Sequence, residues 1–266
     1  MKKWLRRLLA LLLVAIFAVS VVKIVRQIRD YQKGHANYSE AEELAGIQQP
    51  NVDIPAAEVE EGAAACNPYI EALAKTDLES LRLVNSDVIG WIAVPNTKIS
   101  YPLLRTENND YYLNHTWNKE SSSVGSIILE YRVSPDFSDF HTIIYGHRMR
   151  DGSMFGSLKS YGDTEYWKEH PSVYVVDDAG MHQYDIFAAY EMETDRISDS
   201  IFISEDAEKQ EFIQHSLQNS AIDTGIVPTE QDHVLSLITC TGRGYSTRWV
   251  IQAVLCEDAL QEETTE

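Results

Sequence analysis

Eight short runs of β-branched and aromatic residues, separated by turn residues, constrain the fold of this chain more than any other feature. They cover residues 88–94, 99–104, 124–129, 141–145, 172–176, 182–190, 234–240 and 249–255. Each run has the length and composition of a strand. Because few helical patterns separate them, a closed or sandwiched β architecture is favoured over a doubly wound sheet. The predicted fold class is mainly β, with the eight strands closed into a barrel.

Two helices are expected beside the barrel. Apolar residues of the segment 68–83 recur roughly at helical intervals, which predicts a short helix packed on the domain. A long insertion between the sixth and seventh strands contains residues 206–217, where Phe212, Ile213 and Leu217 stand among many charges. That pattern is typical of a surface helix.

The N-terminus carries an anchoring or secretory signal. Basic residues precede an uninterrupted apolar run over residues 8–22. These residues rise only about 22 Å as a helix, so their flanks must join them to cross a hydrocarbon core of roughly 30 Å. A cleaved signal peptide is the alternative, because residues 18–20 resemble a cleavage site, but no polar, helix-breaking segment precedes them. A transmembrane anchor over residues 1–33, with a short N-terminus inside the cell, is therefore favoured.

Composition divides the rest of the chain. Residues 34–67 are polar, contain two prolines and lack a sustained apolar period, so we expect a juxtamembrane stalk. Residues 68–257 form the predicted main domain, and residues 258–266 form an acidic tail. The whole chain has a net charge of −19 although its first 33 residues are basic, so the exported domain is strongly acidic. Nucleic acid is therefore not an expected partner, because phosphates are bound by Lys and Arg.

The three cysteines, Cys66, Cys240 and Cys256, do not indicate a disulfide framework, because their number is odd and no CxxC pair occurs. Cys240 differs from the other two in context: it ends a hydrophobic strand, and a turn with two glycines follows it. Strand ends that open into loops are where rigid scaffolds present reactive groups. Cys240 is the candidate nucleophile, with a buried structural thiol as the alternative, and Cys66 and Cys256 are taken as structural.

Two arginines follow Cys240. Arg248 begins the returning strand, so a hairpin would place it beside Cys240. A guanidinium there could favour the thiolate and donate hydrogen bonds to an oxyanion, with a surface ion pair as the alternative. Arg243 lies within the glycine turn, where less holds its side chain, and is the second candidate.

His147 is the candidate acid-base group among the eight histidines. It follows an apolar strand and Gly146 and precedes a loop, so it too lies at a strand end. An imidazole within reach of a thiol can take or return its proton, whereas a loop histidine satisfied by the backbone is the alternative. His141 begins its strand and is not assigned a catalytic role. No HExxH, CxxC pair or calcium loop occurs, so neither a metal nor a cofactor is expected.

These segments together resemble the sortases, and specifically class B. The segment SLITC at 236–240 matches the family's TLxTC motif, and the segments IIYGHRMRDGSMFG at 143–156 and STRWVIQAVL at 246–255 are similar to the family as well. The stretch 125–158, which includes the second of these segments, is long and specific. The resemblance spans roughly residues 81–255. The signal-anchor and the two predicted helices also fit class B.

The resemblance implies a sortase barrel with a Cys-His-Arg site. Cys240 would attack the Thr carbonyl of a C-terminal sorting signal, His147 would protonate the leaving amine and later deprotonate the incoming one, and Arg248 would stabilise the oxyanion. The implied partners are surface proteins or pilins that bear the signal, the amine of a peptidoglycan precursor, and the membrane through the N-terminal helix. The implied location is the cell membrane, with a single pass and an extracellular catalytic domain.

An NPxT-type sorting signal is also implied. The family's substrate-contacting Asn and Leu match Asn109 and Leu113 in this chain. Ser236 replaces the first Thr of the motif, and Ile238 occupies its variable position, where some class B enzymes contact substrate through a hydroxyl. Ile238 is therefore counted with the substrate-binding residues, and these departures leave the preferred signal open.

Three other functions remain to be weighed. A pilin-polymerising sortase would use a lysine amine as its acceptor, and the sequence does not separate this activity from cell-wall anchoring. A non-catalytic surface binding protein is disfavoured, because all three catalytic residue types are present. A papain-like protease is disfavoured, because the candidate nucleophile Cys240 follows His147 in the chain and no early nucleophile in CW-type surroundings occurs.

Overall fold

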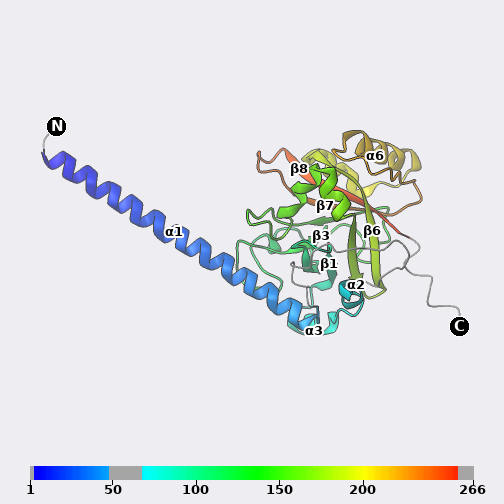
Figure 1. Ribbon diagram of the computed structural model, residues 1–266, viewed down its shortest axis with the longest axis horizontal. Helices are drawn as coiled ribbons and strands as arrows, with labels where there is room; N and C mark the ends of the chain where they lie inside the picture. The colour runs from blue at the N-terminus through cyan, green and yellow to red at the C-terminus, as the bar shows by residue number, and fades with distance from the viewer. Residues whose placement is uncertain (1–2, 48–67, 257–266) are drawn as a thin grey trace.

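The eight predicted strands close into one barrel in the computed structural model, which describes residues 3–47 and 68–256 (Figure 1). The strands are β1 Val88–Ala93, β2 Ser100–Leu104, β3 Ile127–Leu129, β4 His141–Tyr145, β5 Ser172–Asp177, β6 Gly180–Glu193, β7 Val234–Cys240 and β8 Thr247–Leu255. Their order around the barrel is β1-β2-β3-β4-β7-β8-β6-β5. The pairs β2/β3 and β4/β7 are parallel, and the other pairs are antiparallel. The prediction of an eight-stranded barrel is confirmed.

The predicted strand boundaries hold closely, and β4 and β7 begin and end where the sequence placed them. The largest shortening is in β3, which begins at Ile127 rather than at residue 124. Gly125 has a φ of +64°, and the next amide, of Ser126, donates to the carbonyl of Tyr112 instead of to a strand. The residues before β3 therefore form a turn that leads into the barrel.

The helices lie around the barrel rather than within it. They are α1 Lys3–Leu44, α2 Pro68–Leu73, α3 Leu78–Val84, α4 Thr164–Glu169, α5 Thr194–Asp199 and α6 Asp206–Asn219, with 3₁₀ helices η1 Tyr111–Leu113, η2 Gly156–Gly162 and η3 Ser200–Phe202. The single helix predicted over residues 68–83 is two helices, because Asp77 accepts a hydrogen bond from the Ser80 amide and caps a new helix. The predicted helix at 206–217 is α6.

The insertion between β6 and β7 covers the outer face of the barrel beside β4. His141 of β4 is buried between the carbonyl oxygen of Ser200 and the hydroxyl of Ser236, at 2.8 and 2.7 Å, and its ring lies 4.5 Å from that of Phe212 in α6. Burial lowers the pKa of His141 to about 4, so the imidazole is neutral at physiological pH. This histidine holds the insertion against the sheet, in keeping with its exclusion from the candidate site.

The first helix, α1, has two parts with different surroundings. Its N-terminal part is apolar enough to cross a membrane, and none of its most hydrophobic window is buried inside the protein. Figure 1 shows this part projecting away from the barrel. The C-terminal part is buried along one stripe formed by Gly34, Asn37, Tyr38 and Ala41, and Ala45, directly after the helix, is buried as well. This stripe has the spacing of one helix face.

Polar contacts fix the C-terminal part of α1 to the loop between η1 and β3. The indole of Trp117 donates to the carbonyl of Asn37 at 2.6 Å, and the Asn37 amide donates to Glu120 at 2.9 Å. The hydroxyl of Tyr38 donates to the carbonyl of Gly125. The segment expected to be a stalk thus begins as a helix packed on the barrel, while its later part, residues 48–67 with Cys66, and the tail 258–266 lie outside the described residues.

Candidate active site

The register of β4 against β7 brings Cys240 and His147 to one edge of the barrel. These neighbouring strands run parallel, and Tyr145 lies opposite Ile238. Cys240 and His147 each follow that pair by two residues, at the carboxyl ends of their strands. The amide of Gly146 donates to the carbonyl of Ile238 at 3.1 Å, which continues the pairing toward the two side chains. Residues 93 positions apart in the chain therefore become neighbours.

The hairpin of β7 and β8 adds Arg248 to the same edge. Cys240 and Arg248 form the last directly opposed pair of this antiparallel ladder. Directly opposed residues place their side chains on the same face of a sheet. Arg248 Nη1 donates to the carbonyls of Tyr245 and Thr247, at 3.0 and 2.9 Å, so the turn holds the guanidinium in place.

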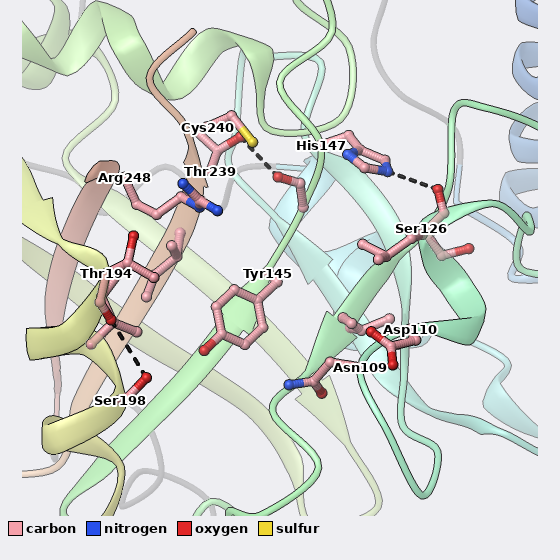
Figure 2. A pocket seen from close by; sticks show the side chains of 15 residues that line it. Asn109, Asp110, Ser126, Tyr145, His147, Thr194, Ser198, Thr239, Cys240 and Arg248 are labelled. Carbon is pink, nitrogen blue, oxygen red and sulfur yellow. Dashed lines mark hydrogen bonds between the residues drawn. The ribbon is translucent and has the colours of Figure 1, made fainter. Parts of the chain in front are cut away.

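His147 is oriented by a backbone carbonyl. Its Nε2 lies 2.8 Å from the carbonyl oxygen of Leu113, and because a carbonyl only accepts, Nε2 carries the proton. The other nitrogen, Nδ1, lies on the side of the ring that faces Cys240 (Figure 2). Within the described part of the chain no hydrogen bond joins the imidazole to the thiol. The ring is thus held with one nitrogen free for proton exchange.

A single pocket of about 300 Å³ contains all six residues that the sequence proposed for the site. Its lining consists of Asn109, Asp110, Leu113, Ser126, Ile128, Tyr145, Gly146, His147, Thr194, Ile197, Ser198, Ile238, Thr239, Cys240 and Arg248. Figure 2 shows Cys240, His147 and Arg248 around one end and Asn109 at the other, with Tyr145 between them. The structure therefore brings the three candidate catalytic residues and the three candidate substrate contacts together.

Two residues of this region were not singled out from the sequence: Thr239, which lines the pocket, and Arg148, which follows His147. The hydroxyl of Thr239 donates to the carbonyl of Gly146 at 2.8 Å, which ties the two strand ends together beside the thiol. Arg148 donates to the carbonyl of Thr241, immediately after Cys240. Both residues belong to the motifs quoted above, and this was the one feature of the sequence that could have pointed to them. Their partners, however, are backbone atoms of a distant strand, which no local pattern reveals.

The second candidate cation, Arg243, lies away from this arrangement. Its side chain is 81% exposed, and its Nη1 lies 3.5 Å from a carboxylate oxygen of Glu191. Arg243 does not line the pocket, whereas Arg248 does. The geometry agrees with the ranking of the two arginines.

Gly125 packs directly against the imidazole of His147. A Cβ at this position would lie 2.6 Å from His147 Cδ2 and 2.9 Å from its Nε2. Gly125 also has a φ of +64°, in the left-handed region that favours glycine. Since Tyr38 donates to the Gly125 carbonyl, the packed part of α1 contacts the turn that supports the histidine.

We expect Gly125→Ala to lower kcat/KM about tenfold or more, because the added methyl displaces His147, and to cost about 1 kcal/mol through the left-handed backbone alone. Peptide-cleavage kinetics and thermal unfolding would measure the two effects. Gly225→Ala is the matched control, because Gly225 has a φ of +73° and no neighbour within 4 Å of its added Cβ. Equal activity of the two variants would show that Gly125 does not support the histidine.

The arrangement has the parts that acyl transfer requires. A partly exposed thiol, an imidazole with a free ring nitrogen and a guanidinium held by backbone carbonyls surround one pocket. A thiol attacks an acyl carbon most readily as a thiolate, an imidazole exchanges the proton, and a fixed cation stabilises an oxyanion.

Comparison with known proteins agrees with this chemistry. The sortase domain family matches residues 92–256. A protein named Sortase B from Listeria monocytogenes is 34% identical over 193 residues, which cover 72% of this chain and 78% of the relative. The family match, over residues 92–256, includes every strand after β1 and all six candidate site residues.

Solved structures agree in fold as well. The crystal structure of sortase B from B. anthracis in complex with AAEK2 superimposes with a TM-score of 0.67 and 28% identity, over 85% of this chain and 96% of that one. A Staphylococcus aureus sortase B–substrate complex gives a TM-score of 0.63 and 28% identity, over 67% and 83% of the two chains. This chain accordingly belongs to the sortase family, as a class B sortase and a cysteine transpeptidase.

Proposed function

We propose that this sortase cleaves an NPxT-like C-terminal sorting signal after its Thr and transfers the acyl group to an amine of a cell-wall precursor. One observation carries the proposal: Cys240, His147 and Arg248 line the same pocket as Asn109 and Leu113. The similarity to a sortase B that was solved as a complex with its substrate supports a peptide in this pocket.

In the proposed reaction the Cys240 thiol gives its proton to Nδ1 of His147, and the resulting thiolate attacks the Thr carbonyl carbon. Arg248 donates hydrogen bonds to the oxyanion that forms. The C–N bond then breaks, and His147 gives its Nδ1 proton to the leaving amine. The acyl group stays on sulfur as a thioester. An incoming amine attacks the thioester, His147 takes its proton, and the thiolate leaves.

The remaining lining offers a place for the signal. Leu113 and Ile238 add apolar side chains to the pocket lining, and Asn109 adds a polar one. Ile238 has no hydroxyl, so it contacts the signal only through apolar surface. We assign Asn109, Leu113 and Ile238 to substrate binding.

We further propose that residues 1–33 anchor the protein as a single-pass helix, with the catalytic domain, residues 68–257, outside the cell. The exposed apolar part of α1 supports an anchor. If Ile24 and Val25 extend the apolar run and end the span, nine helical positions lead from Val25 to the packed Gly34, a rise of about 14 Å, so the barrel would lie close to the membrane. Carbonate extraction of membranes should leave the full-length protein in the pellet, whereas its release as a shortened chain would indicate a cleaved signal peptide.

Intact-mass analysis of the protein incubated with NPxT-type and LPxT-type peptides tests the proposed reaction, with and without an added amine. We expect an acyl adduct on Cys240 with the NPxT-type peptide, and its conversion to a ligated product by the amine. A peptidoglycan-type amine and a pilin-type lysine peptide compared side by side identify the acceptor class. Absence of adduct and product with both peptides would contradict the proposed signal.

A further inference from the structure

A buried carboxylate lies behind the substrate pocket and is not one of its lining residues. Glu130 follows β3, and its side chain is 0% exposed. A buried carboxylate is stable only when its oxygens accept hydrogen bonds from fixed donors. Glu130 meets this condition through contacts to Arg132 on one side and to two pocket residues on the other.

Five donors surround this carboxylate. Its Oε1 accepts from the backbone amide and Nε of Arg132, at 3.2 and 2.8 Å. Its Oε2 accepts from Arg132 Nη2 at 3.1 Å, from Asn109 Nδ2 at 2.8 Å and from the hydroxyl of Tyr145 at 3.2 Å. Burial acts to raise the pKa of Glu130, but the hydrogen bonds from Arg132 and Asn109 outweigh it and lower the pKa below its ordinary value. The carboxylate is therefore ionised and accepts only.

An accepting carboxylate sets the direction of both pocket hydrogen bonds. The Asn109 amide must turn Nδ2 toward Glu130, and its Oδ1 then accepts from the Tyr131 amide at 3.1 Å. If the Asn109 amide were flipped, its oxygen would face the Glu130 carboxylate and its NH₂ group would face the Tyr131 N–H, so neither hydrogen bond could form. Tyr145 has one hydroxyl proton, and that proton is directed at Glu130. Toward the pocket, the Tyr145 oxygen can therefore only accept.

We propose that Glu130 is a positioning residue for substrate selection: by fixing Asn109 and Tyr145 it makes the pocket accept a signal side chain that donates a hydrogen bond. The inference rests on the proposed function, because it concerns the signal bound in that site. In an NPxT-type signal the Asn amide is the side chain that carries N–H donors. Asp has the same shape and, when ionised, offers no donor, so Tyr145 discriminates against it.

Glu130→Gln keeps the size of the side chain but replaces a carboxylate that only accepts hydrogen bonds with an amide that both accepts and donates. The new amide has one acceptor oxygen in place of two and carries no charge, so the hydrogen bonds that Asn109 Nδ2 and the Tyr145 hydroxyl donate to residue 130 weaken or reorient. Asp185→Asn is the matched control. Asp185 lies on β6 outside the pocket and likewise accepts from neutral side chains, Ser172 at 2.7 Å and Gln183 at 3.0 Å.

The first measurement uses no substrate. The side-chain amide signal of Asn109 in an ¹H–¹⁵N NMR spectrum is assigned by its disappearance in Asn109→Asp. We expect this signal to shift in Glu130→Gln and to stay in place in Asp185→Asn. An unchanged signal in Glu130→Gln would overturn the positioning role, whether or not any peptide is turned over.

The second measurement compares two peptides that differ only in Asn or Asp at the first signal position. For the wild-type protein we expect kcat/KM to favour Asn about tenfold, the value of one hydrogen bond. In Glu130→Gln the preference for the Asn peptide should fall to about threefold or less. The fall should come from a higher KM for the Asn peptide, with its kcat nearly unchanged. Asp185→Asn should keep the wild-type preference. A preference that survives in Glu130→Gln, or an equal loss of kcat for both peptides, would overturn the proposal.

The two measurements separate this inference from the proposed function. If neither peptide acylates wild-type Cys240, the assignment of the signal fails, and the Asn109 amide signal alone decides whether Glu130 positions the pocket.

Discussion

Replacing Cys240 with alanine should abolish the acyl adduct and lower peptide turnover about a thousandfold or more. The thiol supplies the atom that bonds to the acyl group, and Cys240 carries the one thiol among the described residues that line the pocket. Stability should change by less than about 1 kcal/mol, because the side chain is partly exposed at a strand end and fills little of the core. Intact-mass analysis and thermal unfolding of the same preparation measure both effects.

Cys256→Ala is the matched control for this experiment. Cys256 is the other partly exposed cysteine of the described chain, and it follows β8 rather than lining the pocket. This variant should keep the adduct and the turnover of the wild-type protein. Full turnover in Cys240→Ala would exclude the thiol as nucleophile, and loss of the adduct in Cys256→Ala would place the nucleophile elsewhere.

Arg248→Lys should lower kcat about a hundredfold, with a smaller change in KM. The Arg248 guanidinium already donates to the carbonyls of Tyr245 and Thr247, and its remaining N–H groups stay available for an oxyanion. A lysine ammonium has three donors on a flexible stem and cannot satisfy both carbonyls while it presents a fixed pair to the substrate. Single-turnover acylation followed by mass spectrometry measures the effect.

Arg243→Lys provides the comparison within the same turn. Since Arg243 is largely exposed and outside the pocket, its replacement should leave the acylation rate within about twofold. The adduct should still form slowly in Arg248→Lys, unlike in Cys240→Ala, because the nucleophile is intact. A wild-type rate in Arg248→Lys together with a slow rate in Arg243→Lys would move the oxyanion role to Arg243.

Local patterns were sufficient for the strands and for the identity of the candidate site. The β4 and β7 runs consist mainly of β-branched and apolar residues and are bounded by turn residues, so both ends were visible in the sequence. Cys240, His147 and Arg248 stood out because each lies at a strand end, and the pocket contains all three. The resemblance to class B sortases added Asn109, Leu113 and Ile238, which line the same pocket.

The packing of α1 was not visible in the sequence. Its buried stripe consists of Gly34, Asn37, Tyr38 and Ala41, which are mostly small or polar. Such a stripe carries no hydrophobic period, although it has helical spacing. It is buried because Gly34 allows a close approach to Val124 and because Asn37 finds polar partners on the loop before β3.

The sequence by itself determined the barrel class, most strand boundaries, the apolar N-terminal helix and the choice of candidate catalytic residues, because these depend on local composition and on motifs. Only the tertiary structure decided that β4 and β7 are parallel neighbours in the register that joins His147 to Cys240. It also decided that Glu130 is buried against Asn109 and Tyr145. Register and buried hydrogen bonds depend on residues far apart in the chain, which the packing of the whole barrel brings together.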